Sequence, residues 1–234
     1  MGCQSTFTPP LKAFLLSSSS LSQVSSSQRS SSQCSEELAT ADLILASASP
    51  RRSDLLHQIG VRFVVAAEDI DERKRPAEQA VDYVGRLALE KAQAGYRRSE
   101  TELPVLGADT VVLCQGEIFG KPDNADEAIG MLQALSGSTH EVLSGVAIVN
   151  AHKSELVVSK TSVTFRTISP QDCLKYWQTG EPEGKAGAYA IQGFGATFVA
   201  HLEGSYSGVV GLPLLETQQL LEKFNVPIWQ QPNA

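Results

Sequence analysis

The hydrophobic and polar positions of this chain follow two periods, and most stretches keep to one of them. Apolar residues at three- and four-residue spacing indicate helices, whereas alternation or a short apolar run indicates a strand. The helical period predicts helices over 50–59, 76–98, 123–135, 170–179 and 214–224. The strand period predicts strands over 43–46, 61–67, 105–113, 118–119, 140–150, 155–168 and 196–202.

The first 41 residues differ from the rest of the chain. They are rich in Ser and Gln, and Glu36 is their first acidic residue. Such a segment buries too little apolar surface to fold alone, so we predict that residues 1–41 form a disordered arm. A targeting peptide and a lipid anchor on Gly2 remain open as alternatives, because the arm is poor in acidic residues and begins Met-Gly-Cys-Gln-Ser-Thr.

Three other segments follow neither period. The glycine-rich residues 180–195 predict an irregular loop whose backbone approaches a ligand closely. We expect a tight turn over 204–208 and a short, frayed tail over 227–234. The folded domain should therefore span 42–226.

The bulk composition limits the classes of function. With 42% hydrophobic and 19% charged residues among 234, the chain has ample material for a globular core. A net charge of −7 argues against nucleic acid as a partner, and no apolar run is long enough to cross a membrane. The four cysteines form no CxxC motif and predict neither a zinc site nor a disulfide framework. We expect a cytoplasmic protein in a reducing compartment.

The turn between the first predicted strand and helix has the features of a phosphate-binding loop. It places the Ser47 hydroxyl and the guanidinium groups of Arg51 and Arg52 beside free backbone N–H groups at a helix N-terminus. The alternative is an ordinary helix cap with a solvated first turn. The helix dipole disfavours cations at this end, so two arginines here need an anion nearby. We therefore favour a phosphate ligand.

Two carboxylates and one lysine form a second set of candidates. Asp109 stands inside an apolar strand, where a carboxylate is costly unless it is paired or bound to metal; the alternative is an Asx turn. Glu72 lies in an acidic loop over 68–73, which suits either a hard cation such as Mg2+ or a solvated charge run. Lys91 falls near the apolar face of its helix, which fits either a phosphate contact or a snorkelling side chain.

Later loops add two lysines and a glutamine. Lys121 lies on a Gly-Lys-Pro corner, and Lys185 and Gln192 are suited to contact a phosphate or a base edge. Cations with a few carboxylates are what phosphoryl transfer requires, with a divalent metal to neutralise the phosphate oxygens and a carboxylate to activate water. No GxSxG motif is present, so we expect hydrolysis by water rather than by a serine nucleophile.

Several motifs, in this order, carry a family resemblance. They are LASASPRR (45–52), GADTVV (107–112), GKP (120–122), GKAGAYAIQG (184–193) and GSYSGVVGLPL (204–214). Together they resemble the Maf family of nucleoside triphosphate pyrophosphatases over 43–224. The resemblance implies a two-lobed Maf/ITPase-like α/β fold, with a mixed twisted β-sheet flanked by helices and a central cleft. It also implies hydrolysis of a nucleotide to its monophosphate and pyrophosphate with a divalent cation, Mg2+ or Mn2+, and makes a homodimer plausible.

The resemblance assigns roles motif by motif. The sequence GAYAIQG resembles the branch of the family that acts on dTTP and UTP. Asp109 matches the proton acceptor that activates water, and Glu72 matches a carboxylate that joins it at the metal. The positions that set base specificity match Arg52, Thr110 and Gln192. The phosphates are expected to lie against Ser47, Arg51, Lys91, Lys121 and Lys185.

One departure from the family and one alternative function remain. The family usually has Asp before the lysine of KAGAY, where this chain has Gly184. This difference predicts weaker metal binding unless the adjacent Glu183 substitutes. The alternative function is a nucleotide-binding regulator of cell division with little catalysis. The presence of both Asp109 and Glu72 favours the enzyme.

Overall fold

A mixed seven-stranded sheet organises the chain. The computed structural model describes residues 38–230, so the predicted arm lies almost wholly outside the described residues. The strands are β1 (Leu43–Leu45), β2 (Phe63–Val65), β3 (Val105–Cys114), β4 (Glu117–Phe119), β5 (Thr139–Val149), β6 (Ser154–Phe165) and β7 (Val199–Glu203). The helices are α2 (Pro50–Gln58), α3 (Ala80–Arg98), α4 (Ala125–Leu135), α5 (Pro170–Gln178), α6 (Tyr206–Val210) and α7 (Leu214–Lys223), with 3-10 helices η1 (Ala186–Ala188) and η2 (Gly193–Phe198).

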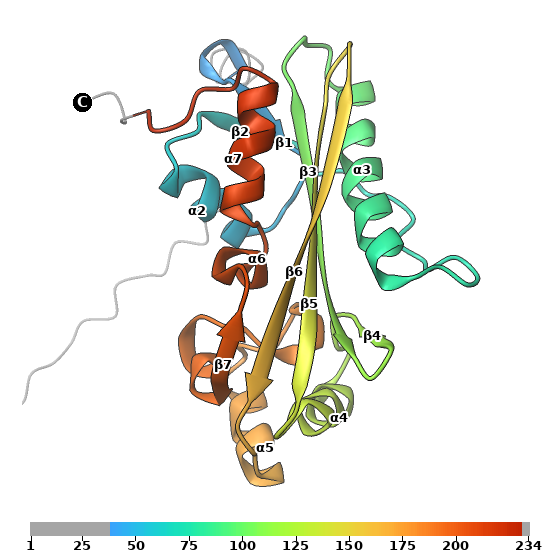
Figure 1. Cartoon of the computed structure of the whole chain (residues 1–234), viewed down its shortest axis with the longest axis vertical. Helices are drawn as coiled ribbons and strands as arrows, with labels where there is room; N and C mark the ends of the chain where they lie inside the picture. The colour runs from blue at the N-terminus through green and yellow to red at the C-terminus, as the bar shows by residue number, and fades with distance from the viewer. Residues whose placement is uncertain (1–37, 231–234) are drawn as a thin grey trace, which may run out of the picture.

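The long strands β3, β5 and β6 run through the length of the molecule, and helices lie on both faces of the sheet (Figure 1). The strand order is β2-β1-β3-β5-β6-β7, with β4 paired to β3. Strand β1 is parallel to β2 and β3, whereas the other pairs are antiparallel. Helix α3 packs on one face, and α2, α6 and α7 pack on the other. The expected α/β fold with a mixed sheet flanked by helices is confirmed.

One edge of β3 is shared by two strands that do not meet. The pairing of β1 with β3 reaches Leu106, and the pairing of β4 with β3 begins at Val112. Residues 107–111 therefore have no strand partner on this edge, although β5 covers them on the other. The gap separates a lobe around β1 and β2 from a lobe around β4, and it is where the GADTV motif lies.

Two glycines allow α3 to approach the sheet closely. A Cβ on Gly107 would lie 2.3 Å from the carbonyl oxygen of Ala88, and a Cβ on Gly145 would lie 2.7 Å from that of Val84. Such distances exclude any side chain, so β3 and β5 present bare backbone to the helix. The small residues Ala88 and Ala92 fill the same contact from the helix side. This packing fixes how far Lys91, on the same helix, stands from β3.

The structure corrects three sequence predictions near the C-terminus. Residues 196–198, predicted as the start of a strand, are part of η2, and β7 begins only at Val199. Residues 204–208 are not a tight turn, because the Ser205 hydroxyl caps helix α6 by accepting from the Gly208 N–H at 3.0 Å. Residues 227–230 are not frayed: their backbone bonds to the end of α2, with the Trp229 N–H 2.7 Å from the Ile59 carbonyl.

Two smaller differences concern the ends of elements. Helix α3 begins at Ala80 rather than at residue 76, and β2 is shorter than the predicted strand. Sequence propensity predicts the ends of helices and strands least well, because tertiary contacts decide which terminal turns form. Within the described residues, no helix is both long and apolar enough to span a bilayer.

Candidate active site

A cleft of about 760 Å³ opens at the unpaired edge of β3. A volume of this order suits a small-molecule substrate. The cleft brings together every residue that the sequence predicts for the site. They are Ser47, Arg51, Arg52, Glu72, Lys91, Asp109, Thr110, Lys121, Lys185 and Gln192.

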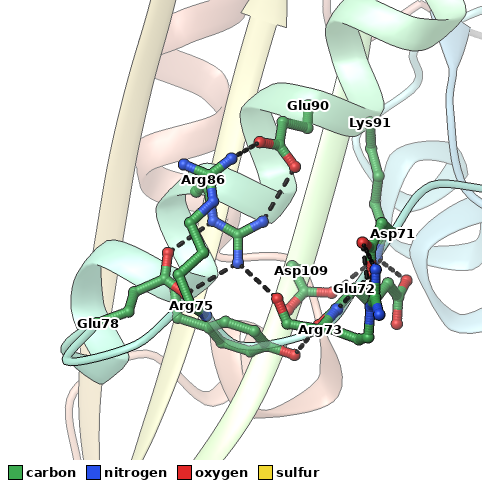
Figure 2. A network of polar contacts seen from close by, with 10 residues as sticks. Asp71, Glu72, Arg73, Arg75, Glu78, Arg86, Glu90, Lys91 and Asp109 are labelled. Atoms are coloured by element: carbon green, nitrogen blue, oxygen red, sulfur yellow. Dashed lines mark hydrogen bonds and ion pairs between the residues drawn. The ribbon is translucent and has the colours of Figure 1, made fainter.

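A lysine and two carboxylates, Lys91, Asp109 and Glu72, form what we call the charged wall of the cleft (Figure 2). The Lys91 Nζ lies 2.8 Å from the Asp109 Oδ1 and 2.7 Å from the Glu72 Oε1. Lys91 and Asp109 are 9% and 8% exposed, whereas the Glu72 side chain is 50% exposed. Lys91 therefore points inward instead of snorkelling, and Asp109 pairs with an ammonium group instead of with turn amides.

The loop that carries Glu72 is held against α3 by side chains of the helix itself (Figure 2). The Arg86 guanidinium donates to the Glu78 carboxylate at 2.6 and 2.9 Å and to the Arg73 carbonyl at 3.2 Å. The Tyr83 hydroxyl donates to the Glu72 carbonyl at 2.8 Å. These contacts hold the backbone at the Glu72 and Arg73 carbonyls, and the Glu72 carboxylate bonds to Lys91.

The electrostatic surroundings keep Glu72 ionised. Burial alone would raise the pKa of Glu72, but the hydrogen bond from Lys91 and the charges of Lys91, Lys121 and Arg52 hold it below its usual value. The pKa of Tyr83 is raised by burial and by the nearby charges of Asp109 and Glu72. Glu72 is therefore an anion at neutral pH, and the Tyr83 hydroxyl beside it keeps its proton.

Thr110 faces the side of the sheet opposite to Asp109, because successive side chains of a strand alternate. Arg52 donates to the Thr110 hydroxyl at 3.4 Å, to the Ser47 hydroxyl at 2.9 Å and, through Nε, to the Gly211 carbonyl at 2.9 Å. Burial lowers the pKa of Arg52, and the charge of Asp109 counteracts this. Arg52 thus ties the first turn of α2 to β3 and to the end of α6.

Arg51 has a different environment from its neighbour. Its Nε donates to the Val210 carbonyl at 3.1 Å, close to the C-terminal end of α6, and burial lowers its pKa. Carbonyl groups at a helix C-terminus offset part of a cation's charge. The two Nη groups of Arg51 have no hydrogen-bond partner among residues 38–230, so they remain available to an anion in the cleft.

The glycine-rich loop, residues 180–195, forms the remaining side of the cleft. The Gly187 N–H donates to the Gly120 carbonyl at 2.9 Å and joins this loop to the corner that carries Lys121. Burial and the charge of Arg51 lower the pKa of Lys185. The side chain of Gln192 is exposed in the cleft, and its amide has no partner in the described part of the chain.

Three supporting residues were not predicted from the sequence. Ser144 donates to the Gly208 carbonyl at 2.7 Å and contacts the Thr110 hydroxyl at 3.1 Å; Tyr83 and Arg86 hold the Glu72 loop. A polar residue within an apolar strand is a signal that could have identified Ser144. Helical spacing from Lys91 could have identified Tyr83, which lies on the same face two turns earlier.

Comparison with known proteins agrees with these observations. The family described as "Maf-like protein" matches residues 42–224. The "dTTP/UTP pyrophosphatase" of Saccharophagus degradans is 49% identical over 194 residues, which cover 82% of this chain and 92% of that protein. The protein of the same name from Pseudoalteromonas atlantica is 52% identical, over 79% of this chain and 97% of that protein.

Solved structures of the same general kind are more distant. The Staphylococcus aureus Ham1 protein is 13% identical, with a TM-score of 0.46, over 78% of this chain and 98% of that chain. The family match and the curated relatives cover nearly all of the folded part, from the SPRR turn through the GADT strand to α7. This chain therefore belongs to the Maf-like protein family.

Proposed function

We propose that this protein is a dTTP/UTP pyrophosphatase, which hydrolyses each nucleoside triphosphate to its monophosphate and pyrophosphate. The observation that carries the proposal is the convergence of Asp109, Glu72 and Lys91 in a cleft that Arg51 and Lys121 also line. Relatives about half identical to this chain carry that name and support the same reaction. Cations for the phosphates and a carboxylate for the water are the parts that such a reaction needs.

Asp109 is the proposed proton acceptor. Its Oδ1 is taken by Lys91, whereas its Oδ2 has no hydrogen-bond partner among the described residues. That oxygen can accept a proton from a water molecule directed at the phosphate chain, and cleavage between the α- and β-phosphates then releases pyrophosphate. Lys91 orients the carboxylate through its hydrogen bond to Oδ1, which leaves Oδ2 directed to the water.

The triphosphate is proposed to lie along the cations of the cleft. Arg51 presents two unpaired Nη groups, and Lys121 and Lys185 come from the opposite lobe. Ser47 lies at the helix N-terminus and also receives an N–H from Ser49 at 3.3 Å. Lys91 stands where the phosphates would meet the two carboxylates. These four cations neutralise the charge that develops on the leaving pyrophosphate, and the Ser47 hydroxyl adds a neutral donor.

The base is proposed to be read by Gln192, with Thr110 and Arg52 as supports. A free amide offers one donor and one acceptor, which matches the edge of uracil or thymine. Arg52 is already bonded to Ser47, Thr110 and Gly211. It therefore influences specificity by fixing the Thr110 hydroxyl rather than through a free guanidinium.

The residues of the charged wall fit a divalent metal. Within residues 38–230 no cluster of three or more His, Cys, Asp or Glu side chains forms a protein-only metal cage. Mg2+ is usually held by one or two carboxylates together with substrate phosphates, and Glu72 and Asp109 already converge on one cationic group. When bound, such a metal would neutralise phosphate oxygens and lower the pKa of a coordinated water.

A cytoplasmic location and a homodimer also belong to the proposal. Cys114 and Cys173 are buried free thiols, which fits a reducing compartment. Sedimentation of the purified full chain would establish whether it dimerises.

The test is pyrophosphate release from UTP, dTTP, CTP, ATP and 7-methyl-GTP, with Mg2+, with Mn2+ and with a chelator. We expect metal-dependent release from UTP and dTTP, and little from the other three. Tight nucleotide binding without any release would instead support the regulator of cell division.

A further inference from the structure

The segment that carries Gln192 is fastened to one side-chain pair, the buried Tyr176 and the half-buried Glu181. The Glu181 carboxylate accepts from the Phe194 N–H at 2.9 Å and from the Gly195 N–H at 2.8 Å. It also accepts from the Tyr176 hydroxyl at 2.7 Å. The Tyr176 oxygen in turn accepts from the Ala190 N–H at 3.1 Å. The backbone is therefore held two residues before Gln192 and again two and three residues after it.

The Tyr176 side chain of this pair lies in the hydrophobic core. Tyr176 is 2% exposed on α5, and its ring packs edge-on against Phe198, with centroids 4.9 Å apart. Burial and the Glu181 carboxylate raise the pKa of Tyr176, so its hydroxyl keeps its proton. Burial raises the pKa of Glu181, but the three hydrogen-bond donors lower it. The net effect is a pKa below the usual value. The pair is thus an ionised acceptor and a permanent donor at neutral pH.

Two glycines let the backbone wrap around this pair. Gly193 has φ +73°, and a Cβ there would lie 2.3 Å from the Glu181 Oε2. A Cβ on Gly195 would lie 2.6 Å from the Tyr176 hydroxyl oxygen and 2.3 Å from the Ala190 carbonyl. The Gly-Phe-Gly sequence after Gln192 is therefore required by the carboxylate and the hydroxyl that it encloses. Neither Tyr176 nor Glu181 lines the cleft, so any effect on the base is indirect.

We propose that Tyr176 and Glu181 are positioning residues: they fix the backbone that carries Gln192, limit where its amide can reach, and so set the discrimination between uracil and cytosine. The inference rests on the proposed function, in which Gln192 reads the base. Uracil and cytosine differ at the edge that an amide contacts, because one presents a carbonyl and an N–H where the other presents an amino group and a bare nitrogen. An amide that is free to rotate or shift accepts either edge, whereas one on a fixed backbone favours one of them.

The experiment compares kcat and KM for UTP and CTP in the full chain and its variants. Glu181→Gln replaces one acceptor oxygen with an amino group that faces an N–H donor. We expect the UTP-over-CTP ratio of kcat/KM to fall about tenfold, the scale of a lost hydrogen bond to a charged group. The change should appear mainly as a higher KM for UTP, with kcat within about threefold, since the charged wall is untouched. Tyr176→Phe leaves the two N–H contacts of Glu181 and should lower the ratio about threefold.

Matched controls and a double variant separate positioning from general stability. Glu100→Gln and Tyr206→Phe change exposed residues outside the cleft and should leave the ratio unchanged. Gln192→Ala should abolish discrimination, and adding Glu181→Gln to it should lower the ratio no further, because both act through one amide.

Each failure has a distinct signature. Equal losses for UTP and CTP in Glu181→Gln, together with a lower melting temperature, would overturn the proposal and leave a structural role only. An unchanged ratio in Glu181→Gln would also overturn it. Absence of pyrophosphate release from UTP in the unaltered protein would instead contradict the proposed function itself.

Discussion

The two sides of the cleft are built by different means. The loop over 66–79 that brings Glu72 to the charged wall is fastened by ion pairs between side chains, several of them open to solvent. Its Arg75–Glu90 and Arg98–Glu68 pairs with α3 have arginine side chains that are 63% and 77% exposed, whereas the Arg86–Glu78 pair is nearly buried, at 12% and 8%. The Glu72 and Arg73 carbonyls also accept hydrogen bonds from α3, whereas the glycine-rich loop is fastened by three backbone N–H groups that bond to Tyr176 and Glu181.

This difference matches what each side has to do. Exposed ion pairs contribute little individually and are weakened by salt, so away from the Arg86–Glu78 pair the loop over 66–79 can adjust when charge enters the cleft. Hydrogen bonds to the backbone leave fewer ways to move, because φ and ψ are restrained directly. A side that neutralises phosphates tolerates small shifts, whereas a side that reads the edge of a base does not.

Among changes to the charged wall, Asp109→Asn is expected to lower kcat the most. Lys91 keeps Glu72 as a partner, so the fold should survive, but the proposed proton acceptor is lost. We expect kcat for UTP to fall at least about 100-fold, the usual scale for a general base. Asp126→Asn, an exposed change in α4, is the control and should stay within about twofold. Turnover close to normal in Asp109→Asn would remove the residue from the mechanism.

A smaller effect is expected from Glu72→Gln. The amide keeps the shape of the side chain but loses the charge that a divalent cation requires, so the Mg2+ concentration for half-maximal activity should rise about tenfold. Asp71→Asn on the neighbouring residue is a close control and should change this concentration by less than about twofold, because among residues 38–230 Asp71 pairs only with the exposed Arg73. Equal Mg2+ dependence in the two variants would exclude Glu72 as a metal ligand.

Arg86→Gln tests the comparison between the two loops directly. It removes the guanidinium group that donates to the Glu78 carboxylate and the Arg73 carbonyl, and it leaves Lys91 and Asp109 in place. We expect amide hydrogen exchange over 70–79 to quicken about tenfold, and exchange over 186–195 to stay as it is. The Mg2+ requirement should rise about threefold, less than for Glu72→Gln. Faster exchange in both loops would mean that they are not independently held.

Lower pH should reduce the free energy of unfolding through His140, which contacts the glycine-rich loop at Tyr189. Buried His140 bonds to the Tyr189 hydroxyl at 2.9 Å, and burial lowers its pKa to about 4. The unfolded chain takes up this proton near pH 6.5, so stability is full above that value and declines as pH falls toward 4. We expect the urea midpoint to drop over that range, and to drop less in His140→Gln. The exposed His201→Gln should follow the unaltered protein, and a matching slope in His140→Gln would contradict the assignment.

Sequence patterns predicted most of the fold because most of it depends on local signals. The β3–β4 hairpin, for example, follows from alternating residues around Gln115-Gly116. The cleft residues were found because their charges are misplaced in apolar or helix-start positions, as Asp109 and Arg51 are. The conformation of residues 193–198 could not be predicted, because it depends on hydrogen bonds from the Phe194 and Gly195 N–H groups to a carboxylate outside the segment, on Glu181. The capped helix α6 was missed because Ser205 was taken for part of a turn.

The smallest effect is expected where the chain departs from its family. A Cβ on Gly184 would meet no heavy atom within 4 Å, and its φ of +67° is one that Asp tolerates better than most residues. Lys185 contacts the Glu183 carbonyl at 3.4 Å rather than its carboxylate, which leaves that carboxylate free to serve the cleft. Gly184→Asp should therefore change kcat and the Mg2+ requirement by less than about twofold, at a cost in stability of about 1 kcal/mol. A Mg2+ requirement that falls markedly in this variant would mean that Glu183 does not replace the missing carboxylate, and that the charged wall of this protein holds its metal more weakly than those of its relatives.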